Sequence, residues 1–552
     1  MNPRSPFRLL FRLFEGRFFE SDEVSPGGGF QTNIHQVLGL LATSGFVVAY
    51  LSLPMVGSYL DRQHGANLAW ALRQVQLFHP AFTFAVIGFT AFFEWDMLFP
   101  TRRDFLVLAP FPIRLRDLFA AQFTALARFL GLLIAAVNVF PILFTVLMSF
   151  SARFRGNGLR LVLAEIAGTV GVSAFAFIGV AALQGVLINV TSPRLFRRIS
   201  PYIQMCGMGL MILSLLTFPI YAQLLRPAAE HRQVWVWFFP PVWFMGFYDL
   251  FFPNPHGLFA ALGIHAIRTL AAAVALLAMA WTAGFRRQYR RTLEAEDSRP
   301  RAHSVQTPAL LARSPEERAI FRFSGKTLAR SRKHQLFLAT YLSVGISLAL
   351  IFGTAVRAGK LAISHDGARA VPFLVAFFVI SGFRAVFQFP AELPANWLFR
   401  ITESRWAEMA RAVTRKRVLI SGLAPVLLLL VPAEVAVWGT RRVPFELLFQ
   451  FAAGALLIEA IFWTFDKVPF TCSYFPGRTN LSILFAAYLY GFSYYSFNLA
   501  DLEADLEKRF WYGALVLVSA AVLLTLSWRY RREAGPTRFD AYEPAIQTLN
   551  LN

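Results

Sequence analysis

Apolar stretches of about 20 residues recur along nearly the whole chain, and this repetition limits the possible folds more than any other feature. One stretch begins at Val37 and contains no charged residue until Asp61. A helix needs about 20 residues to cross a hydrocarbon core about 30 Å thick, and in that core the backbone must satisfy its own hydrogen bonds. The sequence therefore predicts a membrane protein built from α-helices.

The composition agrees with this class. Of the 552 residues, 56% are hydrophobic and 15% are charged, and the formal net charge is +21. Soluble domains have about 25% charged residues. The basic residues gather in short loops between the apolar stretches, as the positive-inside rule describes. We therefore expect membrane lipids as partners and no nucleic acid.

A hydropathy window of about nineteen residues predicts twelve transmembrane helices, so the fold class is an all-α polytopic membrane protein. The predicted spans of the first half are residues 37–58, 78–98, 120–150, 161–190, 203–224 and 262–284. Those of the second half are residues 335–356, 370–390, 417–438, 445–465, 480–500 and 511–530. The bias of Lys and Arg between loops predicts that both termini of this multi-pass protein lie in the cytoplasm.

The chain is expected to have five parts. They are an amphipathic N-terminal cytoplasmic helix at 1–36, a first six-span half at 37–284, a basic cytoplasmic linker at 285–334, a second six-span half at 335–530 and a cytoplasmic tail at 531–552. Arginines alternate with Phe and Leu at three- and four-residue steps in the N-terminal helix, which suits the lipid headgroup region. Each half has an insert rich in Pro, aromatic residues and Arg after its second span, at 100–118 and 391–416. This shared placement predicts a two-fold pseudo-repeat.

The two halves differ between their fifth and sixth spans. Residues 234–263 in the first half are too apolar for a solvated loop, and their prolines exclude one straight span. These prolines are Pro240, Pro241, Pro253 and Pro255. A short re-entrant or interfacial helical pair is therefore expected there. The second half has only a short acidic loop near Asp501 at the corresponding place.

No motif for catalysis, metal binding or nucleotide binding is found. Gly325-Lys326-Thr327 has the end of a phosphate-binding loop, but Ile320 occupies the position of the first glycine and no strand is expected before it. Cys206 and Cys472 form no disulfide framework or cysteine metal site, and the histidines lack ligand spacing. We therefore expect no cofactor, no metal site and no catalytic residue, so the chain is not expected to be an enzyme.

Charged residues inside the predicted spans are the best candidates for function, because each costs roughly 2.5–3.5 kcal/mol at the centre of a membrane helix. The candidates are Glu165, Arg268, Arg384, Glu434 and Glu459. Glu165 and Arg384 lie toward span ends, so their charged groups are expected to reach for the membrane interface. Glu459 lies deeper, and either a functional role or a structural ion pair would account for it.

The stretch Asp104-Phe-Leu-Val-Leu-Ala-Pro110-Phe-Pro112-Ile-Arg114-Leu-Arg116 resembles a segment that follows the second span in ABC-2-type exporter permeases. The layout of the whole chain is similar to that family, as two six-span halves fused in one polypeptide. Ala109 stands where the family has leucine, and the second half lacks the outer helical pair.

The resemblance implies a permease in the plasma (inner) membrane of a prokaryote that exports an unidentified small or amphiphilic substrate and depends on a separate ATPase subunit. It also implies that both inserts couple to this ATPase. The residues concerned are Asp104, Pro110, Pro112, Arg114 and Arg116 in the first insert, with Trp397, Arg400, Glu403 and Arg405 in the second.

Two other functions stay open at this point. An ion- or proton-coupled secondary transporter would need paired ionisable residues near the middle of the membrane, for which Glu459 and Arg268 are the candidates. A membrane-embedded enzyme acting on lipid-linked substrates would need an accessible cluster of acidic or histidine side chains.

Overall fold

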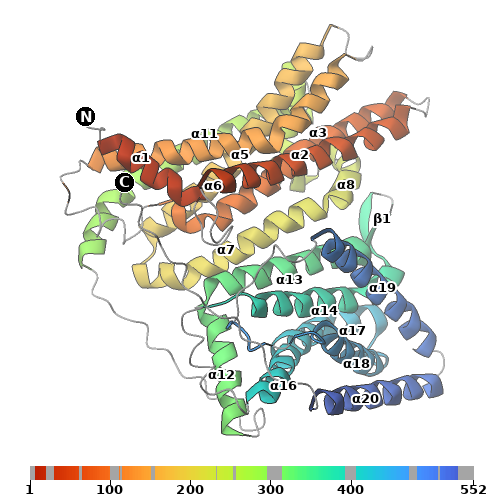
Figure 1. Ribbon diagram of the computed structural model, residues 1–552. Coiled ribbons are helices and arrows are strands. Elements are labelled where there is room, and N and C mark those ends of the chain that lie inside the picture. Colours follow the sequence, from red (N-terminus) through yellow and green to blue (C-terminus); the bar gives the residue numbers. More distant parts are fainter. Residues whose placement is uncertain are drawn as a thin grey trace. The chain divides into compact units, whose positions relative to one another are not determined.

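The computed structural model describes residues 6–19, 30–60, 65–99, 111, 115–150, 156–231, 233–252, 257–294, 314–357, 359–391, 406–465, 467–471, 481–507 and 510–532 (Figure 1). The chain forms two compact units, Met1–Pro300 and Arg301–Asn552. We refer to them as unit 1 and unit 2. The division falls within the segment 285–334 that was expected to be a linker.

Unit 1 is helical throughout its described residues. Its elements are α1 (Pro6–Phe19), α2 (Phe30–Leu60), α3 (Gly65–Phe93), the 3₁₀ turn η1 (Trp95–Met97), α5 (Leu115–Ser149), α6 (Gly158–Val190), α7 (Pro193–Leu216), α8 (Phe218–Glu230), the 3₁₀ turn η3 (Val234–Trp237), α9 (Pro240–Met245), α10 (Phe247–Phe251) and α11 (Leu258–Glu294).

Unit 2 adds one small sheet to its helices. Its elements are α12 (Pro315–Arg330), α13 (Arg332–Gly353), β1 (Thr354–Arg357), β2 (Lys360–Ile363), α14 (His365–Gln388), α16 (Trp406–Val418), the π-helical turn η7 (Leu419–Leu423), α17 (Ala424–Trp438), α18 (Val443–Ile461), α19 (Leu481–Glu507) and α20 (Phe510–Arg532). β1 and β2 form an antiparallel hairpin in which Thr354 pairs with Ile363.

Ten helical segments in the described part of the chain are long and apolar enough to cross a membrane. They are Leu38–Met55, Leu72–Phe93, Ala120–Ser149, Gly158–Val190, Arg194–Leu216, Leu258–Thr282, Arg332–Gly353, His365–Gln388, Met409–Trp438 and Val443–Ile461. The prediction of an all-α polytopic membrane protein is confirmed. The segments expected at 480–500 and 511–530 are also helical, in α19 and α20, but the apolar part of α20 is only Trp511–Ser527.

Two boundaries differ from the expectation. The span expected over 203–224 is broken at Thr217, where α7 ends and α8 begins with Pro219 in its first turn, because proline cannot continue the hydrogen bonds of the preceding helix. The acidic loop expected near Asp501 is the last part of α19, which continues to Glu507. Its helical form is explained by Glu503 and Glu507, which lie one turn apart and bond to side chains of other helices.

Local sequence signals account for several helix ends. Ser192 caps α7 by accepting a hydrogen bond from the backbone N–H of Leu195 at 3.3 Å, and Pro193 follows at the first helical position. Gly439 ends α17 with a φ of 81°, a conformation that favours glycine.

Each unit is centred on its second predicted span. In unit 1, 78% of the apolar segment of α3 is buried, and α3 packs against α2, α5, α6, α7 and α9. In unit 2, 83% of α14 is buried among α13, α17, α18 and α19. The other eight apolar segments are at most half buried. A central helix screened from lipid is where polar side chains can be placed at least cost.

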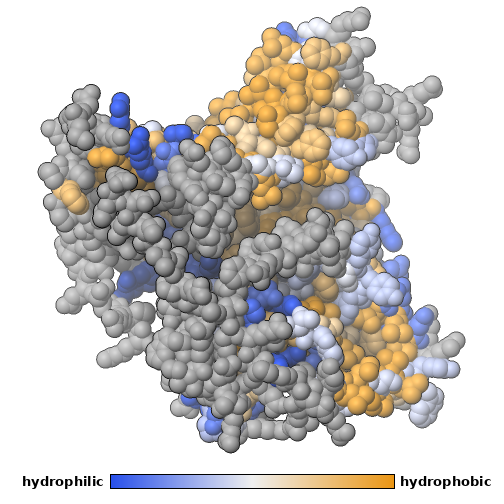
Figure 2. Space-filling model, in the orientation of Figure 1, coloured by the Kyte–Doolittle hydropathy of each residue, from blue (hydrophilic) through white to orange (hydrophobic). Residues whose placement is uncertain are grey.

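The outer helices expose apolar side chains in both units. Large hydrophobic residues are exposed on α2, α5, α17 and α20, including Phe46, Leu147, Leu429 and Val518. Figure 2 shows such apolar residues over much of the described surface. A soluble protein rarely exposes so much apolar surface, whereas a hydrocarbon environment requires it.

The helical pair expected within 234–263 is present as α9 and α10, which meet at Gly246. A Cβ atom at Gly246 would lie 2.3 Å from the carbonyl oxygen of Phe259 and 2.4 Å from the amide nitrogen of Gly263. Glycine is thus required for the pair to lie directly against α11.

The N-terminal helix α1 is amphipathic, as expected from its sequence. Leu10 and Phe14 are buried against α5, while Arg8 and Arg12 are exposed. Arg128 of α5 forms an ion pair of 2.8 Å with Glu15. The helix is therefore joined to the third predicted span of unit 1.

Candidate functional site

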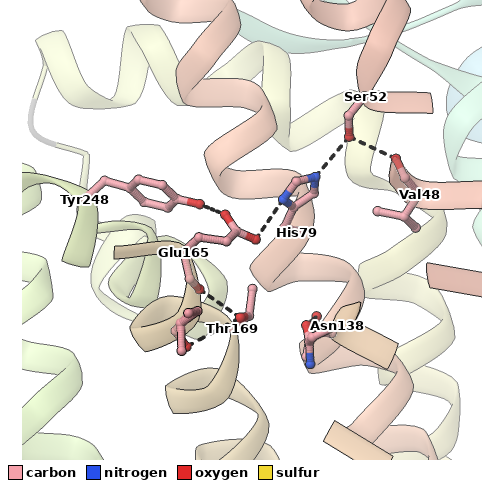
Figure 3. Close-up of polar contacts among 9 residues, drawn as sticks. Val48, Ser52, His79, Asn138, Glu165, Thr169 and Tyr248 are labelled. Atoms are coloured by element: carbon pink, nitrogen blue, oxygen red, sulfur yellow. Dashed lines mark hydrogen bonds and ion pairs between the residues drawn. The ribbon is translucent and has the colours of Figure 1, made fainter. Parts of the chain in front are cut away.

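A chain of buried polar contacts joins four helices of unit 1 (Figure 3). Nε2 of His79 in α3 lies 3.0 Å from Oγ of Ser52 in α2, and Nδ1 of His79 lies 2.9 Å from Oε1 of Glu165 in α6. The hydroxyl of Tyr248 in α10 donates a hydrogen bond to Oε2 of the same carboxyl. All four side chains are at most 3% exposed. We call Ser52, His79, Glu165 and Tyr248 the buried chain.

The hydrogen bonds of the buried chain assign all of its protons except one. The Ser52 hydroxyl donates to the carbonyl of Val48 at 2.9 Å, so its oxygen must accept from Nε2–H of His79. The contact between Nδ1 and Glu165 then needs one more proton, held either by the imidazole ring or by the carboxyl group. His79 and Glu165 therefore share one proton between Nδ1 of the ring and Oε1 of the carboxyl group.

Two further contacts extend this network to neighbouring helices. One turn after His79, the hydroxyl of Thr83 donates to Oδ1 of Asn138 in α5 at 2.7 Å. On α10, Asp249 forms an ion pair of 2.5 Å with Arg73 of α3. Polar contacts therefore connect α2, α3, α5 and α6 to the short helix α10.

The expectation that Glu165 reaches for the membrane interface is wrong. Its side chain is 1% exposed because His79 and Tyr248 supply hydrogen-bond partners inside the unit. No sequence motif pointed to His79, Ser52 or Tyr248. The available signal was a histidine within an apolar span, since such a side chain needs a polar partner in a neighbouring helix.

The charged residues near the C-terminal end of α18 cap that helix. Arg384 of α14 donates to the carbonyl of Ile461 and, at 2.8 Å, to Oγ1 of Thr464. Arg415 of α16 donates to the carbonyl of Phe462 at 2.7 Å. Arg384 was expected to extend toward the interface, and it is instead held by the last turn of α18, where a cation is favourable.

Of the two interpretations left open for Glu459, the structure contains the ion pair. Nε of Arg415 lies 3.3 Å from Oε2 of Glu459. Arg268, the residue considered with it, is exposed on α11 in unit 1. Arg268 belongs to unit 1 and Glu459 to unit 2.

A second polar site lies among α17, α18 and α19 of unit 2. It contains Glu434 of α17, Glu446 and Gln450 of α18, and Glu503 of α19. Nε2 of Gln450 donates to Oε1 of Glu503 at 3.3 Å. We call these four residues the carboxyl cluster. The sequence pointed only to Glu434, because Glu446 opens a span and Glu503 was assigned to a loop.

Two arginines stand beside the carboxyl cluster. Arg369 of α14 and Arg442 both bind the carboxylate of Glu507, at 3.1 Å and 2.9 Å. Arg369 also lies over the ring of Trp438, 4.5 Å from its centroid. Both guanidinium groups are thus directed to the end of α19.

The residues expected to couple to an ATPase lie outside the described part of the chain. They are Asp104, Pro110, Pro112, Arg114, Trp397, Arg400, Glu403 and Arg405, together with the side chain of Arg116. The described residues contain no group of three or more His, Cys, Asp or Glu side chains placed to hold a metal ion.

The segment Gly325-Lys326-Thr327, whose sequence matches the end of a phosphate-binding loop, has a packing role. Gly325, Lys326 and Thr327 lie within helix α12, so they form no loop around a phosphate. A Cβ atom at Gly325 would lie 2.5 Å from Nη2 of Arg417. The glycine makes room for this guanidinium, which covers the ring of Phe321 at 3.5 Å from its centroid.

Comparisons of the chain with protein-family models, with curated proteins and with solved structures found no match.

Proposed function

We propose that this chain is the membrane-spanning permease of an exporter driven by ATP, which a separate ABC ATPase subunit hydrolyses. The single observation that carries the proposal is the attachment of the broken helical pair α9–α10 to the long helices of unit 1 through the buried chain. The substrate would be small or amphiphilic, and the protein would lie in the plasma membrane with both termini in the cytoplasm.

The order of elements in unit 1 supports this function. An amphipathic helix joined to α5 precedes the spans, and a broken helical pair precedes the last long helix α11. This is the order that the resemblance to ABC-2-type permeases implies. The short helices matter because non-helical backbone at membrane depth is tolerated where it is buried in protein or lines a cavity.

The polar contacts would provide a route for movement through unit 1. Helix α5 starts at Leu115, within the last residues of the first insert. Asn138 of α5 bonds to Thr83 of α3, and the buried chain leads from α3 through Glu165 to α10. Unpaired polar groups are costly in a medium of low dielectric constant, so helices joined by these bonds would move together. A displacement of the insert by the ATPase would thus reach α10.

The test is purification of the tagged full-length chain from its own membranes in lipid nanodiscs. An ABC ATPase should copurify, and its ATP hydrolysis should change with transport substrate. Arg114→Ala and Arg116→Ala should reduce the copurified ATPase.

The matched control is Arg226→Ala. Arg226 is an exposed arginine that forms an ion pair with Glu230 one turn away at 3.0 Å, a kind of pair worth little, and its guanidinium lies 5.9 Å from the centroid of the Trp70 ring. Copurification should be unchanged by this variant. If no ATPase copurifies and vesicles containing the chain transport without nucleotide, the proposal fails.

A further inference from the structure

The carboxyl cluster brings three acidic side chains and one amide together inside unit 2. Glu434, Glu446, Gln450 and Glu503 are between 2% and 6% exposed. Glu446 lies close enough to Glu434 and Glu507 to interact with them electrostatically, and Glu503 does so with Glu446 and Glu434. Three helices thus direct carboxyl groups into one buried volume.

Several oxygen atoms of the cluster are buried without a hydrogen-bond partner among the described residues. By hydrogen-bond geometry they are both carboxyl oxygens of Glu434, Oε2 of Glu446 and the amide oxygen of Gln450, although the side chain of Gln450 also lies close enough to Glu434 to interact with it. All four atoms are acceptors as long as the carboxyl groups are ionised, so none of them can bond to another. A proton on a carboxyl group turns it into a donor and allows a bond to a neighbouring oxygen.

The charges around the cluster are not balanced. Arg369 and Arg442 are the cations that face it, and the carboxylate of Glu507 binds both of them. The buried Nη1 of Arg369 bonds to none of the described side chains. The described side chains of α20, which packs on α18, carry no charge. Two cations therefore face four carboxyl groups, and excess negative charge in a buried site is costly.

A polar cleft gives water access to this region. It has a volume of about 510 Å³ and is lined by Asp366, Arg369, Arg442, Ala500, Asp501, Ala504 and Glu507. Arg369, Arg442 and Glu507 form an ion-paired layer that lines the cleft, and the same three groups interact electrostatically with Glu446. Water in the cleft can exchange protons with groups behind this ion-paired layer.

We propose that Glu434, Glu446 and Glu503 form a proton-binding site that exchanges with water through this cleft. A metal ion is a poorer occupant, because the described residues offer no group of three ligands with suitable placement. Gln450 would orient the bound protons. Its amide nitrogen donates a hydrogen bond to Glu503, and its amide oxygen can accept a hydrogen bond from a protonated carboxyl group. The site goes beyond the proposed exporter function and does not depend on an ATPase.

The test is infrared difference spectroscopy of the full-length protein in lipid nanodiscs during a pH titration. The wild type should show the C=O absorption of protonated carboxyl groups at neutral pH. Glu446→Gln and Glu503→Gln should each remove part of this band. Asp501→Asn should leave it unchanged, because Asp501 is exposed in the same cleft. A wild type without the band, or a band that persists in both Gln variants, would overturn the proposal.

Two further measurements separate the other outcomes. A band that disappears when sodium replaces choline in the buffer would show a metal ion in the site and overturn the proposal. Glutamine has the shape of a protonated glutamate, so the Gln variants should fold and keep their thermal midpoint at neutral pH. The wild type should lose stability as the pH rises, since its folded form binds more protons than its unfolded form, and the variants should lose less. Gln variants that fail to fold would show that ionised carboxylates are required and would also overturn the proposal.

Discussion

At the residue scale, a buried polar atom is informative because it needs a hydrogen-bond partner, in its own helix or in a neighbouring one. Glu165 has one partner on each oxygen, His79 and Tyr248. The loss of either partner would leave an acceptor buried and unsatisfied, which costs about 1–3 kcal/mol. The hydrogen-bond partners of a charged side chain inside a membrane span therefore indicate which helices are joined to that span.

We expect Tyr248→Phe to lower the stability of unit 1 by about 1–3 kcal/mol, because Oε2 of Glu165 loses its donor. The measurement is the thermal unfolding of the purified protein in nanodiscs. Tyr202→Phe is the matched control, since Tyr202 is 64% exposed on α7 and should tolerate the change. Equal midpoints for the two variants would contradict the role of Tyr248 in the buried chain.

We expect Gly325→Ala to displace the guanidinium of Arg417 from Phe321, because a Cβ atom would lie 2.5 Å from Nη2. Arg417 also donates to the carbonyl of Phe321, and loss of a bond from a charged donor costs roughly 1.5–3 kcal/mol. Hydrogen exchange of α12 should become faster. Gly131→Ala in α5 has nothing within 4 Å of its new Cβ and should not have this effect.

At the element scale, the ease of prediction differs among helices. The long apolar helices were predictable because hydropathy over about 20 residues is a local property. The break at Thr217 also has a local cause, which is Pro219 two residues later. This proline lies within an apolar run, so hydropathy alone does not show the break. The helical end of α19 was not predictable, because Glu503 and Glu507 depend on Gln450 and Arg369 from other helices.

The start of helix α12 is stabilised by a side chain of its own sequence. The Ser314 hydroxyl accepts from the backbone N–H of Glu317 at 3.1 Å, so Ser314→Ala should cost about 1 kcal/mol of stability in this helix. Faster hydrogen exchange at the start of α12 would confirm this. Ser519→Ala is the control, because that hydroxyl only bonds to Leu515 in its own helix.

The same helix start has a defined pH dependence. Hydrogen bonds from its own backbone N–H and from Ser314 lower the pKa of Glu316. A carboxyl whose pKa is lower in the folded state stabilises that state above its unfolded pKa, and the effect is lost as the pH falls through the folded pKa. The protection of α12 amides against hydrogen exchange, corrected for the intrinsic exchange rate at each pH, should therefore decrease in acid, and Glu316→Gln should weaken this dependence.

At the scale of the whole molecule, each unit has its own central helix and its own core. The core of unit 2 is built on α14 and contains Phe373, Phe383 and Phe387. Cores separated in this way should open separately. We expect Tyr248→Phe to speed hydrogen exchange in α3, α6 and α10 while exchange in α14 stays as in the wild type. A parallel change in α14 would show that the two units unfold as one.

The sequence was sufficient for the helical membrane class and for the candidates Glu165, Arg384, Glu434 and Glu459, because charges in apolar spans stand out. It was not sufficient for their partners, since Ser52 and Tyr248 have no pattern that links them to His79. Contacts between helices depend on tertiary packing, and a hydropathy window does not contain that information.

The hairpin of β1 and β2 offers a direct way to learn which side of the membrane each loop occupies. It is a short ribbon between two long helices, and Lys360 near its tip is exposed. The variant Lys360→Cys is made in a chain that also carries Cys206→Ser and Cys472→Ser. Its thiol can be labelled in intact cells by a thiol reagent that does not cross the lipid membrane. The loop bias of Lys and Arg predicts labelling from outside, and protection until the cells are opened would reverse the orientation of every helix.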